Sequence, residues 1–216
     1  LSVENFEADS GLVNFEIKQL AFKEESDFQV NDLKAHMYIG PSKMTFHELT
    51  LRNKRSFLDA DSIIIKHKGY ENLKDFVNKV DLNIGIKQSN LGFHDLAFFA
   101  KPFEKLPDQN IVFSGRLNGR INNLRGNDVF LAMGESTELL TDFSIDGLPD
   151  INKSFLYIDI EDFRTISKDI QLVNYFTKGA QTIRLPENMA NLGVITYKGN
   201  FTGFIDDFVA YGSLKS

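Results

Sequence analysis

Apolar and polar side chains alternate over short stretches in most parts of this 216-residue chain. An apolar side chain at every second position is typical of a strand with one buried face. Turn signals such as Gly40-Pro41 and Gly147-Leu148-Pro149 separate these stretches. We therefore predict an all-β protein, with strands at residues 13–17, 35–39, 49–51, 80–86, 111–121, 128–133, 138–145, 155–160 and 195–205.

One alternating stretch occurs twice in the chain. Residues 111–121 read IVFSGRLNGRI and residues 195–205 read ITYKGNFTGFI, with both glycines at matching places. A repeated strand indicates a repeated structural unit. Glycine inside a strand marks a bend, a bulge or the close approach of another group. We expect the sheet to bend at these glycines, or a ligand to lie beside them.

Helical patterns are few and short. They cover residues 71–79, 93–106, 167–176 and 186–191. We expect these segments to act as plugs or caps at the ends of a sheet, where they block unwanted strand pairing. They are too few to cover the apolar face of so many strands. The strands therefore form either a closed sandwich or a curled sheet whose trough holds a ligand.

Charge and composition exclude several classes of protein. The net charge is −6 and the 24 lysines and arginines are scattered, so we expect no nucleic-acid partner. The chain has no cysteine, which rules out disulfides and thiolate metal sites. Its apolar runs are too short to span a bilayer. It begins without a basic and then apolar leader, and we expect it to be a single segment of a longer, repetitive protein.

Residue patterns for catalysis or metal binding are weak. The four histidines lie in separate segments without metal-ligand spacing, and no serine lies in a Gly-x-Ser-x-Gly motif. Asp159 and Glu161 would share one face of a strand, which is compatible with the paired carboxylates of a glycosidase. No tryptophan is present to stack on a sugar. We expect no enzymatic activity and no cofactor.

Several motifs resemble those of a known family. They are "SFLDADSIIIKH" at 56–67, "LGFHDLAFFAKPF" at 91–103, and a Gly-x-hydrophobic-x-Gly strand followed by Gly134 and Thr137. A "GLPDI" turn at 147–151 and a Thr-x-x-x-Asp-Ile segment at 165–170 come next. In order and spacing, most of residues 28–216 resembles the AsmA-like family, specifically its TamB-like members in Bacteroidetes.

This resemblance implies a fold, a location and a task. Such proteins are anchored in the inner membrane and extend through the periplasm as a long β-sheet, curled lengthwise into an open, apolar groove called a β-taco. They are implicated in moving phospholipid toward the outer membrane, and TamB pairs with an outer-membrane β-barrel. The resemblance therefore implies phospholipid acyl chains as ligands, a barrel partner of the TamA or BamA type, and an inner-membrane anchor outside this segment.

We expect the groove to be lined by apolar residues of the alternating strands. These residues are Val80, Leu82, Ile84, Ile86, Ile111, Phe113, Leu117, Ile121, Ile195, Tyr197, Phe201 and Ile205. Two alternatives remain open at this point. One is a closed β-sandwich that binds carbohydrate or an adhesion partner, and the other is a β-sandwich glycoside hydrolase that uses Asp159 and Glu161.

Overall fold

The strands form one open antiparallel sheet in a computed structural model that describes residues 1–9, 11–23, 29–96, 109–170 and 193–216. Each strand pairs with the next one along the chain, and the two outer strands are not paired with each other in this part of the chain. The strands are β1 (Ser2–Asp9), β2 (Leu12–Lys23), β3 (Gln29–Ile39), β4 (Lys43–Arg52), β5 (Phe57–Lys66), β6 (Asp81–Gly92), β7 (Asn110–Arg120), β8 (Asn123–Met133), β9 (Thr137–Asp146), β10 (Phe155–Ile166), β11 (Val194–Gly203) and β12 (Phe208–Lys215).

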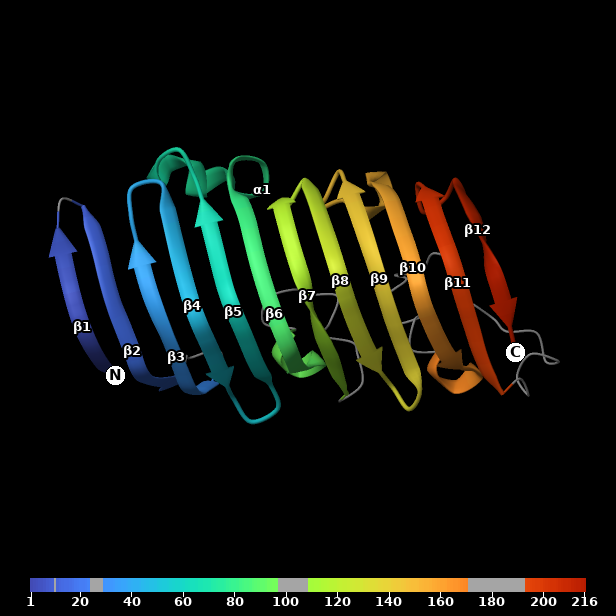
Figure 1. The fold of residues 1–216 in the computed structure, drawn as a ribbon, viewed down its shortest axis with the longest axis horizontal. Coiled ribbons are helices and arrows are strands. Elements are labelled where there is room, and N and C mark those ends of the chain that lie inside the picture. The colour runs from blue at the N-terminus through green and yellow to red at the C-terminus, as the bar shows by residue number, and fades with distance from the viewer. Residues whose placement is uncertain (10, 24–28, 97–108, 171–192) are drawn as a thin grey trace.

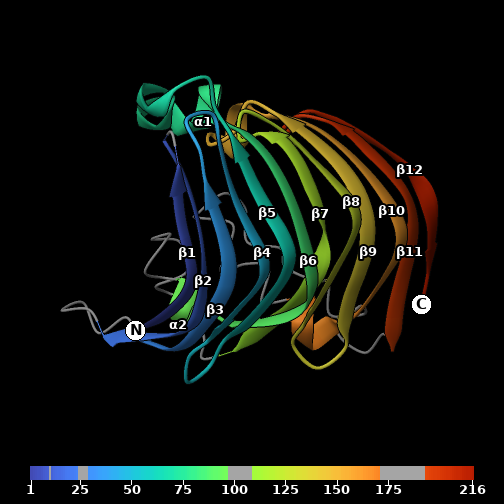
Figure 2. The same ribbon diagram turned by 60° about the vertical axis from the view of Figure 1, so that its left-hand side comes forward.

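The sheet is long in the direction that crosses its strands, and it is curled. Figure 1 shows β1 and β12 at opposite ends of the molecule. Figure 2 shows that every strand is bowed in the same sense, so that the sheet forms a trough. The predicted all-β, lengthwise-curled open sheet is confirmed. The closed β-sandwich alternative is wrong, because all twelve described strands belong to one sheet.

Short helical segments lie at the ends of the strands. They are η1 (Tyr70–Asp75), α1 (Phe76–Lys79), α2 (Phe93–Leu96), η3 (Ile151–Lys153) and a helical turn at residues 167–170. Figure 2 shows α1 and α2 at opposite ends of the strands on the concave side. The helix expected at 71–79 is confirmed. The segments expected at 93–106 and 167–176 are helical at 93–96 and 167–170, and their remainder lies outside the described residues, as does 186–191.

The bend follows a line of register shifts across the sheet. Nine of the eleven strand pairs contain such a shift near the middle of the strand. At such a β-bulge two residues of one strand oppose one residue of the next, which bends the strand and increases its twist. Asn5, Glu48 and Asp128 have positive φ angles of 52°, 49° and 51° and lie on this line. The bulges therefore account for the lengthwise curl.

Several small side chains lie on the inner side of the bend. Ala35 and Ala60 are almost completely buried and form a core cluster with Leu49. Gly115, Gly199 and their flanking residues continue this level of the sheet toward β12. Side chains on the inside of a bent sheet converge, so alanine and glycine beside larger residues such as Leu49 leave room for the curvature.

The paired glycines are required by the approach of the neighbouring backbone. Gly115 has a φ of +137°, and a Cβ atom there would lie 2.8 Å from the Cα atom of Val129. Gly199 has a φ of +155°, and its Cβ atom would lie 2.1 Å from the carbonyl oxygen of Tyr211. Of the two explanations predicted for these glycines, the structure therefore supports a bend with close backbone contact.

The two copies of the repeated stretch form β7 and β11, which are four strands apart in the sheet. The helical segments that follow β6 and β10 are likewise four strands apart. A repeating unit of four strands remains our interpretation of the sequence repeat.

Buried polar contacts fasten the helical segment after β6 to a neighbouring turn. The Ser56 hydroxyl, in the turn between β4 and β5, donates a hydrogen bond to Asp95 of α2 at 2.5 Å. The same hydroxyl oxygen accepts a hydrogen bond from the Gly92 backbone amide at 2.9 Å. Ser56 thereby links a strand turn, the end of β6 and α2.

Asp169 makes an equivalent link on the other half of the sheet. It is 3% exposed and accepts hydrogen bonds from the backbone amides of Glu135 and Ser136 and from the Thr137 hydroxyl. Burial by itself raises the pKa of this carboxyl. The hydrogen bonds from Ser136, Glu135 and Thr137 outweigh burial and hold the pKa below its ordinary value. The carboxylate form therefore fastens the helical turn at 167–170 to the turn between β8 and β9.

We expect Gly115→Ala to destabilise the fold by about 1–3 kcal/mol, because alanine at this positive φ strains the backbone and contacts Val129. Gly85→Ala is the matched control, since its Cβ atom would lie 3.9 Å from its nearest neighbours. We expect that control to be neutral or slightly stabilising. Urea denaturation followed by circular dichroism measures both changes, and equal losses in stability would contradict the explanation.

We expect Asp169→Asn to lower the free energy of unfolding by about 1–3 kcal/mol at neutral pH, because the amide cannot accept all these hydrogen bonds. A carboxyl with a depressed folded-state pKa stabilises the fold above its unfolded pKa, and this stabilisation is lost as the pH falls through the folded pKa. The difference in the free energy of unfolding between the variant and the parent should therefore become smaller at acidic pH. Denaturation curves from neutral to acidic pH test this, with exposed Asp162→Asn as the control.

Candidate functional site

One face of the sheet carries apolar residues in unbroken rows that cross the strands. Directly opposed residues of antiparallel strands point to the same face, so the strand register identifies each row. The upper row takes one residue from every strand and contains only apolar residues and glycines. It consists of Ala8, Val13, Ile39, Met44, Ile65, Leu82, Gly119, Leu124, Ile145, Leu156, Gly203 and Phe208.

A second row, the middle row, runs beside the first from β2 to β12. It consists of Phe15, Met37, Phe46, Ile63, Ile84, Leu117, Gly126, Phe143, Ile158, Phe201 and Ala210.

Aromatic rings make the middle row continuous. A Cβ atom on Gly126 would lie 2.3 Å from the ring of Phe143, so this ring covers the glycine. The ring of Phe6 on β1 lies 6.3 Å from that of Phe15 and extends the row to the first strand. Near the other end, the rings of Phe201 and Phe208 stack at 4.4 Å.

This apolar face is the concave face of the sheet, and we call it the apolar groove. The most shielded apolar side chains of the strands all lie on it, as expected for the inner side of a curl. They are Ile17, Val30, Ala35, Leu49, Ala60, Val129, Leu156 and Ile195. Most members of the upper and middle rows are half-buried, because the inner face of a trough shields its side chains only in part.

Nine of the twelve residues predicted to line the groove lie in strands on this face. They are Leu82, Ile84 and Ile86 of β6, Ile111, Phe113 and Leu117 of β7, and Ile195, Tyr197 and Phe201 of β11. Val80 is completely buried between α1 and the start of β6. Sequence alternation was sufficient to put these residues on one face, because the alternation extends over most of each of the three strands.

Ile121 and Ile205 lie outside the strands in which they were predicted. The strands end at Arg120 and Gly203, so both isoleucines are in turns at the ends of the sheet. Gly203 has a φ of +136°, and after it the Phe204 amide donates to the Asp207 carbonyl at 2.9 Å to form the turn. In both strands the prediction continued the alternation two residues past the last glycine, to positions where the chain already turns.

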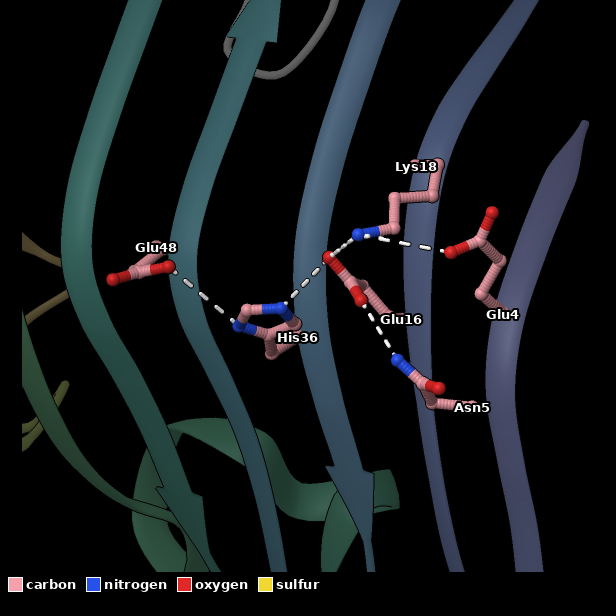
Figure 3. A network of polar contacts seen from close by, with 6 residues as sticks. All are labelled: Glu4, Asn5, Glu16, Lys18, His36 and Glu48. Carbon is pink, nitrogen blue, oxygen red and sulfur yellow. Dashed lines mark hydrogen bonds and ion pairs between the residues drawn. The ribbon is translucent and has the colours of Figure 1, made fainter.

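The convex face carries a chain of charges across β1 to β4. Figure 3 shows this network on the side of the sheet that faces away from the helix behind it. His36 lies between two carboxylates, with Nε2 2.9 Å from Glu16 and Nδ1 3.6 Å from Glu48. Lys18 contacts Glu16 and lies 3.8 Å from Glu4.

These contacts shift the pKa values of the two central groups. The hydrogen bond from Lys18 lowers the pKa of Glu16, and the hydrogen bond to Glu16 raises the pKa of Lys18. Both groups therefore remain charged at neutral pH. Over β1 to β4 the two faces thus differ in character, since the concave face carries the apolar rows and the convex face carries this charged network.

The paired carboxylates considered for glycosidase chemistry lie on β10. Asp159 lies on the convex face, opposite Asp142 and Asn200 of the neighbouring strands. Glu161 lies at the bulge between Ile160 and Asp162, where the register changes. The bulge disturbs the shared face that strict alternation predicted for the two carboxylates.

The fold brings together two histidines that sequence spacing kept apart. His36 and His47 are register partners on β3 and β4. Across the described part of the chain, no group of three or more histidine and acidic side chains is placed to hold a metal ion. The histidine pair could not be predicted from the sequence, because it depends on the register between β3 and β4.

Polar cavities lie where the strands end. One, of about 770 Å³, lies at the end of the sheet that contains the turns β4–β5 and β8–β9. Its lining residues include Lys54, Arg55, Asn90, Gln109 and Glu135. The apolar groove is therefore bordered by polar and charged groups on at least this side.

No protein-family model, curated protein or solved structure matches the chain. In the residues that the structure describes, no helix combines the length and apolar character needed to cross a membrane.

We expect a groove residue to tolerate a polar substitution better than a fully enclosed one. Ile84→Thr changes a half-buried side chain, whereas Val80→Thr places a hydroxyl at a completely buried position. The Val80 variant should lose about 1–3 kcal/mol of stability and the Ile84 variant less, because water near the groove can solvate the hydroxyl. Chemical denaturation of both variants tests this, and a larger loss for Ile84→Thr would contradict a solvent-accessible groove.

Proposed function

We propose that this chain is a segment of a bridge-like lipid-transport protein, in which the apolar groove shields phospholipid acyl chains between the two membranes of a Gram-negative cell. The observation that supports this most directly is the upper row of apolar residues, which crosses all twelve strands without a polar residue. Among the described residues no second sheet covers this row, whereas a row that only stabilised the fold would be expected to be covered by one.

The proposed role of the groove is to lower the free-energy cost of moving a lipid through water. Exposing an acyl chain of about fifteen methylenes costs roughly 0.8 kcal/mol for each one, or about 12 kcal/mol in total. Contact with a continuous apolar surface removes most of this cost at every position along the path. No covalent step is needed, and we therefore propose a binding and conducting role without catalysis.

The dimensions of the groove are compatible with this role. Neighbouring strands lie about 4.8 Å apart, so twelve strands give a groove on the order of 50 Å long. This length exceeds the hydrocarbon thickness of a bilayer, about 30 Å. Acyl chains would lie along the groove, while the charged head groups remain near polar groups such as Lys54 and Asn90 where the strands end.

The resemblance to the AsmA-like family supports the cellular part of the proposal. By this resemblance the protein acts in the periplasm in outer-membrane biogenesis, is anchored to the inner membrane outside this segment, and contacts a β-barrel of the outer membrane. Some residues of the motifs that carry the resemblance have defined structural roles. Gly115 allows the close approach of the Val129 backbone, and Asp169 lies against Gly134 and accepts a hydrogen bond from the Glu135 amide.

The proposal is tested by measuring phospholipid bound to natively purified protein by mass spectrometry. We expect Leu117→Asp and Phe201→Asp to reduce bound lipid several-fold, because each places a carboxylate in the middle row. Asn118→Asp and Thr202→Asp are matched controls, since each neighbours a groove residue but belongs to the opposite face.

Circular dichroism should give the same strand content for all four variants. Equal lipid content in the groove and control variants would contradict the assignment of the groove. The absence of phospholipid from the parent protein, both as purified and after incubation with phospholipid vesicles, would contradict the function itself.

A further inference from the structure

A second polar cavity lies at the other ends of the strands, where a helical connection joins β5 to β6. Its volume is about 340 Å³, which is within the range of small-molecule sites. β5 ends at Lys66, and the chain continues through His67 and Lys68 into η1 and α1. Figure 1 shows this helical connection beyond the ends of β5 and β6. The cavity is lined by residues of the connection and of the ends of β5, β6 and β7.

Positive charge dominates the lining of this cavity. Of the described residues that line it, four are basic and one is acidic, namely Lys66, Lys68, Lys79, Arg120 and Asp81. The chain as a whole has a net charge of −6, so this concentration of positive charge is local. A cleft lined mainly by one sign of charge raises the local concentration of ions of the opposite sign.

Two of these cations have no carboxylate partner. Arg120 Nε lies 3.1 Å and Lys79 Nζ 3.6 Å from an aspartate oxygen. In the described part of the chain, neither Lys66 nor Lys68 forms an ion pair. Lys66 also stands opposite Lys43 in the register of β4 and β5, and directly opposed like charges are unfavourable. An anion in the cavity would offset this repulsion.

The same cavity is lined by a buried histidine whose ring has no hydrogen-bond partner. His67 is 5% exposed, and within the described residues neither of its ring nitrogens forms a hydrogen bond. Its ring packs against that of Tyr70, with 5.4 Å between the ring centroids. An imidazole ring carries at least one N–H donor in either protonation state, and a buried donor without an acceptor is unfavourable. An anion in the cavity would supply an acceptor.

We propose that this cavity binds a phosphate group through Lys66, Lys68, Arg120 and the ring of His67. A phosphate group offers several strong acceptor oxygens and a negative charge, which matches a set of cations and N–H donors. Asn72, which also lines the cavity, adds a side-chain amide donor. A carboxylate, with two oxygens and one charge, would leave most of these donors unused.

The phosphate group can belong to a phospholipid head group or to a free phosphate ion. The first source rests on the function proposed above, whereas phosphate binding itself does not. The position of the cavity favours the head group. Ile65, Leu82 and Gly119 belong to the upper row of the apolar groove, and each directly adjoins a residue that lines the cavity. A phosphate group here would lie just beyond the row on which we expect acyl chains to lie.

Isothermal titration calorimetry in a phosphate-free buffer tests the site on the whole 216-residue chain. The probes are inorganic phosphate and glycerophosphoethanolamine, which is a phospholipid head group without acyl chains. We expect binding whose dissociation constant rises roughly fivefold in Lys68→Gln, because a charge-assisted hydrogen bond is lost. Lys74→Gln is the matched control and should leave the dissociation constant unchanged. Lys74 is exposed on the same connection and is not among the described residues that line the cavity.

A further variant tests the role of the buried ring. His67→Phe keeps an aromatic ring against Tyr70 but removes both nitrogens, so it should weaken phosphate binding several-fold while circular dichroism shows the parent's strand content. The proposal would be overturned by the absence of saturable binding of both probes, by equal losses in Lys74→Gln and Lys68→Gln, or by unchanged binding in folded His67→Phe.

Mass spectrometry of phospholipid bound to the same variants identifies the source of the phosphate group. A head-group site predicts that glycerophosphoethanolamine binds and that Lys68→Gln purifies with less phospholipid than the parent. A site for free phosphate predicts that inorganic phosphate alone binds and that the lipid content is unchanged. A parent protein without phospholipid would contradict the function proposed for the groove, and calorimetry would still decide whether the cavity binds phosphate.

Discussion

The constraint on which this structure depends is that an antiparallel sheet with one apolar face must shield that face from water. The twelve described strands do so by bending around their own apolar surface, and all of them belong to one sheet. The upper and middle rows on the inner face contain no polar side chain. Charges such as those of Glu16, Lys18 and His36 lie together on the outer face (Figure 3).

Curvature arises from local features that each weaken an ideal strand. Bulges in most strand pairs, glycines at positive φ and alanines on the inner side would all destabilise a flat sheet. Because they fall at the same level in successive strands, they add up to one fold line along the molecule. Gly115 belongs to this line, and its close contact with Val129 explains why a larger residue does not fit there.

The ends of the strands are held by buried polar contacts. Ser56 with Asp95, and Asp169 with the turn that precedes β9, each tie a helical segment to the turn that precedes the neighbouring strand. These contacts add fixed links at the strand ends to the backbone hydrogen bonds that hold neighbouring strands together. Such links matter in an open groove, because its half-buried side chains contribute less packing energy than those of a closed core.

Alternation in the sequence was enough to determine the class of fold and most of the candidate groove. Leu82, Ile84, Leu117 and Phe201 could be placed on one face because side-chain direction has a period of two along any strand. Which residues stand opposite one another could not be derived, since register depends on partners distant in sequence. The pairing of His36 with His47 and the unbroken rows are examples.

Bulges and strand ends were likewise decided by the tertiary structure. A bulge moves the alternation by one residue, so the apolar positions of β4 pass from Phe46 to Leu49 at Glu48, and the shared face expected for Asp159 and Glu161 is disturbed. Ile121 and Ile205 continue the pattern beyond the glycines where the chain turns. The sequence by itself determined which side chains avoid water. Only the assembled sheet decided that they face a curled groove, because curvature depends on how the bulges of neighbouring strands align.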